Sequence, residues 1–239
     1  MLCCASERMV PFLVLGAFAG IRHAEIQRLE WKDLRFDEGS IEIHASKAKT
    51  ASRRLVPILP VLKEWLLNHR QPAGLLVSHR NVAFELHMIA KTANQLRRAA
   101  WASARGVTEE QLKEAEEEAK KQKAESRKQK GKLRSQKGEV PPGAETADIE
   151  GWEPFAWKNN GLRHSFISYR LAGIQNTAQV ALEAGNSPQM IFRHYRELVR
   201  PADGEKWFAV TLASVEAAKA ARESGVEGKI VALPKEAAA

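Results

Sequence analysis

The stretch from about residue 104 to residue 150 constrains the fold most, because it cannot supply a hydrophobic core. Residues 119–138 carry nine Lys or Arg and one Glu, and no apolar stripe at helical spacing accompanies them. A segment of this composition buries too little apolar surface to offset the entropy lost on folding. We therefore expect a charged, partly disordered insertion at about 104–150, either a plain linker or a basic arm that contacts phosphates.

The core must then come from the two flanking segments, residues 1–100 and 151–213, which are followed by an Ala-rich tail. Hydrophobic residues make up 44% of the 239 residues, enough for a sizeable core. Apolar spacing and turn residues predict helices over residues 11–20, 23–29 and 60–69, and two antiparallel strands over 40–44 and 54–58. Beyond the insertion we expect a helix over 162–171, one begun by Asn176 or Thr177, and one capped by Ser187. This pattern favours a mainly α fold with a small antiparallel β-sheet.

The net charge indicates the class of partner, and the cysteine content indicates the redox compartment. The 37 Lys and Arg against 29 Asp and Glu give a net charge of +8, which favours a polyanionic partner. Cys3 and Cys4 are adjacent and form neither a disulfide framework nor a zinc site, so we expect a reducing, cytoplasmic setting. The apolar run over residues 9–21 is shorter than the roughly 20 residues that span a bilayer, so we expect a buried helix and no membrane association.

Four short segments in a fixed order carry the functional signal. They are GIRHAEI at 20–26, Lys49 eight residues before Pro57, NGLRH at 160–164, and GNSP at 185–188 followed by Tyr195. Together they resemble the catalytic domain of the tyrosine recombinases (phage-integrase family). That family has an Arg in a G-[LI]-R-x-x-E-[LI] box, a β-hairpin Lys, an H-x-L-R-H box, a G-H-S box, and a Tyr some nine residues later. Each segment alone is weak, and the resemblance over roughly residues 10–212 depends on all four.

The resemblance implies a role for each matched residue. Arg22 and Arg163 would clamp the oxygens of a DNA phosphodiester, because guanidiniums bind them with bidentate geometry. Tyr195 would attack phosphorus and form a 3′-phosphotyrosine, and Lys49 would protonate the leaving 5′ oxygen. Glu25 would orient Arg22. The chemistry requires no metal and no cofactor.

Two positions depart from the family, since Asn160 and Asn186 stand where it has histidines. Asn can hydrogen-bond a phosphate oxygen but cannot exchange a proton near neutral pH, so we expect reduced activity. His164 either hydrogen-bonds a phosphate or has a packing or capping role. The function expected is site-specific DNA recombination or integration, as in mobile genetic elements. The alternatives are an inactive DNA-binding relic of the family, a type IB topoisomerase-like nicking and closing enzyme, and a structural or interaction protein.

The resemblance also implies an assembly on double-stranded DNA. Members of the family act as head-to-tail homotetramers on two DNA sites, so we expect a homo-oligomer. We assign residues 1–213 to the catalytic domain and residues 214–239 to a C-terminal tail, which is either exchanged between protomers or packed on its own domain. Only about 20 residues precede Arg22, so we expect this chain to lack the family's N-terminal core-binding domain.

The net charge predicts a salt-dependent interaction with duplex DNA. Affinity should fall by about 0.9 log unit per log unit of salt for each phosphate that the protein neutralises. Titration of a labelled duplex at several salt concentrations measures this slope. A flat response would contradict phosphate binding.

Overall fold

The computed structural model describes residues 1–47, 53–78, 81–108, 110–115, 117–118, 121, 152–195 and 199–223. Lys49 and most of the expected insertion lie outside these residues. The chain divides into two compact units. The larger combines Leu2–Asn81 with Lys158–Gly225, and the other contains Val82–Trp157. The first and last globular segments of the sequence therefore share one unit, and the interruption between them begins at Val82.

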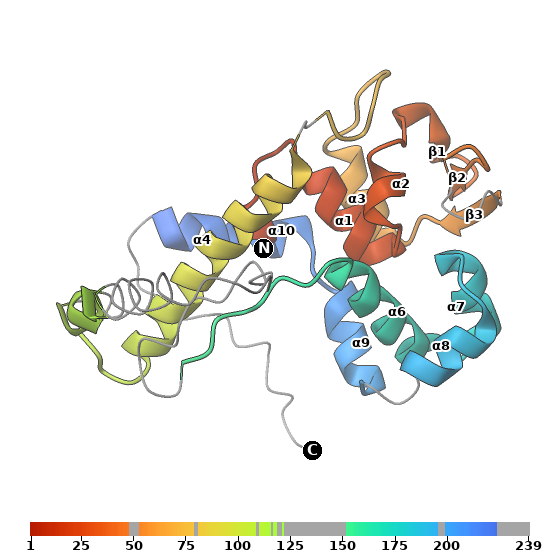
Figure 1. Ribbon diagram of the computed structural model, residues 1–239. Coiled ribbons are helices and arrows are strands. Elements are labelled where there is room, and N and C mark those ends of the chain that lie inside the picture. The colour runs from red at the N-terminus through yellow and green to blue at the C-terminus, as the bar shows by residue number, and fades with distance from the viewer. Residues whose placement is uncertain are drawn as a thin grey trace, which may run out of the picture. The chain divides into compact units, whose positions relative to one another are not determined.

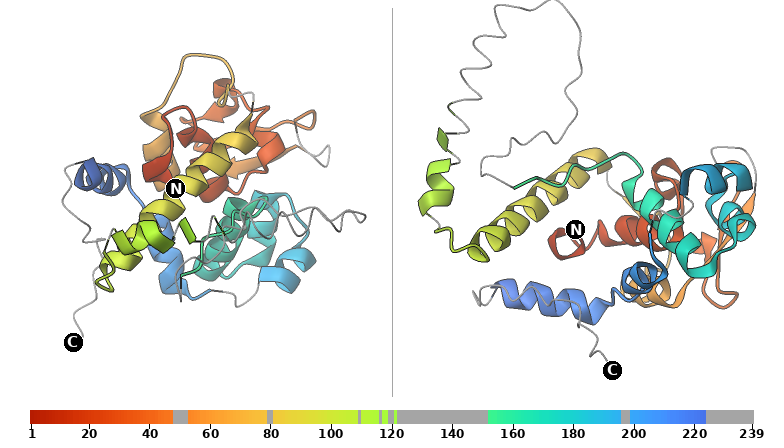
Figure 2. Two further views of the ribbon diagram at one scale, coloured as in Figure 1. Left: turned by 60° about the vertical axis from the view of Figure 1, so that its left-hand side comes forward. Right: turned by 90° about the horizontal axis from the view of Figure 1, so that it is seen from below.

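In the larger unit, a small sheet lies at one edge of a group of helices (Figure 1). Helix α6 contacts α1, α7, α8 and α9, and α6 to α9 remain grouped in both views of Figure 2. The class is α+β, as predicted. In chain order the elements are η1 (Leu2–Cys4), α1 (Val10–Ala19), α2 (His23–Ile26), η2 (Trp31–Asp33), β1 (Leu34–Arg35), β2 (Ser40–Ile43), β3 (Arg54–Pro57), α3 (Pro60–Leu67), α6 (Gly161–Ile174), α7 (Thr177–Ala184), α8 (Pro188–Tyr195), α9 (Pro201–Phe208) and α10 (Leu212–Glu223).

Helix α1 forms the centre of the larger unit. All ten of its residues are buried, and it packs against both α3 and α6. Pro11 lies in its first turn, where the missing N–H costs no hydrogen bond, and Gly20 ends it in the left-handed conformation at φ 61°. In the part of the chain that the structure describes, no helix is long and apolar enough to cross a membrane.

Two glycines let α1 and α6 approach closely. A Cβ on Gly16 would lie 3.1 Å from Leu162 Cβ, and a Cβ on Gly20 would lie 2.3 Å from Phe166 Cδ1. Phe166 is itself 1% exposed, so its ring fills the space that a side chain at residue 20 would need. The crossing of the two helices is therefore fixed by bare backbone on one side and a large ring on the other.

The sheet has the order β1-β2-β3 and is antiparallel throughout. Ile41 pairs with Val56 and Ile43 with Arg54, so the two strands predicted at 40–44 and 54–58 are confirmed as partners. The helix predicted over 23–29 is wrong in extent, because α2 ends at Ile26. The chain then turns, and Leu29 O accepts a hydrogen bond from Leu76 N at 3.0 Å.

The C-terminal elements pack on the larger unit. Trp207 Nε1 donates to Ala17 O at 2.9 Å, and Trp65 Nε1 donates to Val210 O at 3.0 Å. Helix α10 follows, with Val215 buried, and contacts η1. Within this chain the beginning of the tail therefore packs on its own domain, while its exchange between protomers remains a proposal.

The smaller unit is built on α4 (Val82–Ser103), which the sequence patterns above do not predict. Asn94 on α4 fixes the returning chain, because its amide donates to Phe155 O at 2.9 Å and accepts from Phe155 N at 2.8 Å. The ring of Trp101 lies 6.1 Å from that of Trp152. Two segments on either side of the charged stretch thus meet in this unit.

The helix crossing generates a stability prediction. Gly20→Ala should lower the free energy of unfolding more than Gly39→Ala, because both residues have φ above 60° but only Gly20 faces a ring within 4 Å. The excess should be about 1–3 kcal/mol, as for overpacking of a core. Urea denaturation of both variants measures it. Equal losses would mean that backbone strain alone explains the glycine at residue 20.

Candidate active site

A buried carboxylate, Glu25, organises the charged groups of the larger unit. It is 0% exposed. Its Oε1 accepts from Arg22 Nη1 at 3.1 Å, and its Oε2 accepts from the backbone N of Arg22 at 3.3 Å. Arg22 is the residue before α2, so the same carboxylate caps the helix and fixes the guanidinium.

Arg54 is a second cation on the same carboxylate. Its Nη1 donates to Glu25 Oε1 at 3.2 Å and its Nη2 donates to Glu25 Oε2 at 2.6 Å. Strand β3 supplies this residue, and its side chain is 9% exposed. Sequence reasoning missed Arg54, because nothing in the pair Arg53-Arg54 indicates that one member is buried against Glu25.

Arg22 and Arg163 converge on one atom, although 140 residues lie between them. Arg22 Nη2 and Arg163 Nη2 each donate to Asn186 Oδ1 at 3.1 Å. Each guanidinium also has a backbone acceptor, at 2.6 Å from Arg22 to Gly185 O and at 2.5 Å from Arg163 to Gly20 O. The three residues come from the start of α2, from α6 and from the segment after α7.

This cluster is more enclosed than the open pocket that a phosphate site suggests. Arg163 is 5% exposed, and the Arg22 side chain is 15% exposed. The pKa of Arg163 falls to about 10, because burial removes water from its guanidinium and the charges of Arg22 and Arg54 lie nearby. Three guanidiniums therefore share one carboxylate and one neutral amide oxygen, which leaves the cluster positive.

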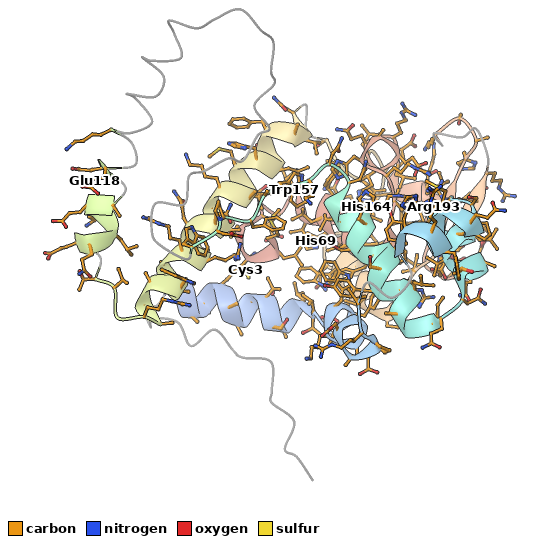
Figure 3. All side chains as sticks on the ribbon, turned by 60° about the horizontal axis from the view of Figure 1, so that its bottom comes forward. Cys3, His69, Glu118, Trp157, His164 and Arg193 are labelled. Carbon is orange, nitrogen blue, oxygen red and sulfur yellow. The ribbon has the colours of Figure 1, made fainter. Side chains whose placement is uncertain are left out.

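Tyr195 ends α8 and contacts His164 on α6. Figure 3 labels His164 on α6 and Arg193, which belongs to α8. Its Oη is hydrogen-bonded to His164 Nδ1, and the two rings are stacked at 5.7 Å between centroids. Burial raises the pKa of Tyr195, with an opposing effect from the charge of Arg163. Burial and that same charge lower the pKa of His164, so its imidazole is neutral near pH 7.

The remaining expected residues are placed differently. Asn160 precedes α6 in the left-handed conformation at φ 55°, and its carbonyl oxygen accepts from His164 N at 3.0 Å. Within the described residues its side chain makes no hydrogen bond to Arg22 or Arg163, whose shared acceptor is Asn186. Lys49 lies outside the described residues. Lys47, two positions earlier, is held by Asp33 Oδ2 at 2.7 Å.

Helix α6 carries both Arg163 of the positive cluster and the imidazole that contacts Tyr195. Because Arg22 and Arg163 both donate to the neutral Asn186 Oδ1, a phosphate oxygen in that place would gain two charge-assisted hydrogen bonds. Among the described residues, no group of three or more His, Cys, Asp or Glu is placed to hold a metal ion. No family model matches the sequence, and no curated protein or solved structure is significantly similar to it.

The cluster predicts a large effect of Glu25→Gln on stability. The variant leaves Arg22 and Arg54 beside a neutral amide, and breaking a buried ion pair costs about 3–5 kcal/mol. Glu38→Gln is the control, because Glu38 pairs with Arg35 at the surface, where changes stay within about 0.5 kcal/mol. Chemical denaturation compares the two variants. Similar small losses would mean that Glu25 does not stabilise the arginines.

Proposed function

We propose that this protein is a DNA strand transferase of the tyrosine recombinase type, which cuts and rejoins duplex DNA through a 3′-phosphotyrosine. The observation that carries the proposal is the convergence of Arg22 and Arg163 on Asn186 Oδ1 at 3.1 Å each. Like charges repel by about 1 kcal/mol at 4 Å in water and by more in a protein interior. Such an approach is expected where an anion binds between the two groups.

In the proposed reaction a phosphodiester oxygen replaces Asn186 Oδ1 between the two guanidiniums. The arginines then stabilise the charge that grows on the equatorial oxygens of phosphorus. Tyr195 Oη attacks, and the 5′ oxygen leaves with a proton from a general acid, the role that the family resemblance gives to Lys49. Asn186 keeps its amide N–H groups for a second phosphate oxygen.

Glu25 and Arg54 support this reaction without touching the DNA. Glu25 accepts hydrogen bonds from Arg22 and from Arg54, so Arg22 is held in position before any DNA binds. Because the guanidinium is already in position, no free energy is spent on reorienting it during the reaction. Such preorganisation is the main source of electrostatic catalysis. Recombination between two DNA sites by a tetramer belongs to the same proposal.

A DNA-binding protein without catalytic activity is the second candidate. Asn186 already accepts a hydrogen bond from the arginine that would bind the phosphate. Burial also raises the pKa of Tyr195, so the phenol is a poor nucleophile unless a base removes its proton. This candidate retains phosphate binding through Arg22 and Arg163 and lacks the covalent step.

A nicked suicide duplex separates the two candidates. Cleavage releases a short oligonucleotide and traps the covalent intermediate, so a pool of nicked duplexes with randomised sequence at low salt should yield a protein–DNA adduct on a denaturing gel. Tyr195→Phe should abolish the adduct. Tyr169→Phe should retain it, because Tyr169 is the chain's other tyrosine and stacks on Trp207. Arg163→Lys should lower the adduct rate by about 100-fold or more, as for loss of one transition-state donor.

Each outcome has one meaning. An adduct that survives Tyr195→Phe would contradict the assigned nucleophile. Binding to the duplex without any adduct would support the inactive candidate. Failure to bind duplex DNA at low salt would contradict both.

A further inference from the structure

The contact between His164 and Tyr195 is not explained by a DNA-binding role alone. His164 follows Arg163 on α6, and successive helical residues point about 100° apart. Arg163 therefore reaches α1, where it donates to Gly20 O, while His164 reaches α8 and bonds Tyr195 Oη. One turn of α6 thus contributes both to the positive cluster and to the contact with the phenol.

We propose that His164 is the general base that takes the proton of Tyr195 when the tyrosine becomes a nucleophile. This inference rests on the proposed function and names a catalytic residue for it. His164 Nδ1 already lies in hydrogen-bond contact with the reacting oxygen, and the stacked rings keep the two atoms together.

The other polar groups of the candidate site that the structure describes do not fit this role. Asn186 cannot accept a proton near neutral pH, and Arg163 is a cation that donates to Gly20 O and Asn186 Oδ1. On α8 itself, Arg193 and His194 precede Tyr195 and are exposed. Residues adjacent in a helix do not face each other, so His194 does not share the face of Tyr195.

The step balances without any further reagent. A bond forms between Tyr195 Oη and phosphorus, the bond from phosphorus to the 5′ oxygen breaks, and the phenolic proton moves to His164 Nδ1. The leaving 5′ oxygen takes a proton from the general acid. On rejoining, the incoming 5′ hydroxyl gives its proton to the conjugate base of the general acid, its oxygen bonds to phosphorus, the P–Oη bond breaks, and His164 returns the proton to Tyr195.

The imidazole must be neutral to act, which gives the reaction a defined pH dependence. Because the pKa of His164 is lowered by burial and by Arg163, the base is available at pH 7. Its protonation at lower pH removes the acceptor. The adduct rate should therefore be level near neutrality and fall in acid, with its midpoint below about 6.5, the usual pKa of histidine, because the pKa of His164 is lowered.

A first experiment reads the proton directly and uses no DNA. In protein labelled with ¹⁵N-histidine, the Nδ1 resonance of His164, assigned with His164→Gln, should show an unprotonated acceptor nitrogen at pH 7. Tyr195→Phe should shift this resonance, because it removes the donor. A protonated Nδ1 at pH 7 would overturn the inference.

A second experiment measures the adduct rate of the full chain between pH 5 and 8. Glutamine accepts a hydrogen bond but not a proton, so His164→Gln should slow adduct formation by about 10²–10⁴-fold, as for loss of general-base catalysis, and remove the fall at low pH. His194→Gln, the exposed neighbour, should leave both unchanged. A wild-type rate in His164→Gln would overturn the inference while the proposed function stands. No adduct from the unaltered protein would defeat the proposed function, and the ¹⁵N result would still decide whether His164 is the acceptor.

Discussion

The close approach of α1 and α6 at Gly20 determines where the charged groups of the larger unit lie. Phe166 packs on the bare backbone of Gly20, and the preceding turn of α6 brings Arg163 to the carbonyl of the same glycine. Arg22 follows two residues later. Burial of one aromatic side chain contributes about 1.5–3 kcal/mol, comparable with the repulsion between two nearby guanidiniums. Apolar packing therefore holds together cations that would otherwise separate.

The two side-chain acceptors in the cluster differ in charge, and this difference would favour an anion beside the neutral one. Glu25 neutralises one charge and is shared by Arg22 and Arg54. Arg22 and Arg163 share a neutral acceptor, the side-chain oxygen of Asn186. An anion that displaced this oxygen would relieve the repulsion and raise the depressed pKa of Arg163. The cluster thus carries an excess of positive charge, which an anion placed there would offset.

Local patterns predicted the strands at 40–44 and 54–58 and a cap at Asn176 or Thr177. In the structure the cap is Asn176, whose side chain accepts from Gln179 N at 3.0 Å. They did not predict the early end of α2, because that depends on a distant segment, Leu76, bonding Leu29. The meeting of Arg22 and Arg163 was expected from the family pattern alone. Glu25 binds Arg54, and His164 binds Tyr195. Both contacts depend on how elements far apart in sequence are oriented relative to each other, which hydrophobic periodicity does not encode.

The division of the larger unit into two stretches of chain has a kinetic meaning. Each stretch brings one of the two converging arginines, and Val82–Trp157 separates them. The intervening chain acts as a tether that sets the effective concentration at which one stretch meets the other. Because the entropy of closing a loop grows only slowly with its length, much chain can be inserted there at little thermodynamic cost. The long separation instead lowers the folding rate, since contacts between residues distant in sequence form late.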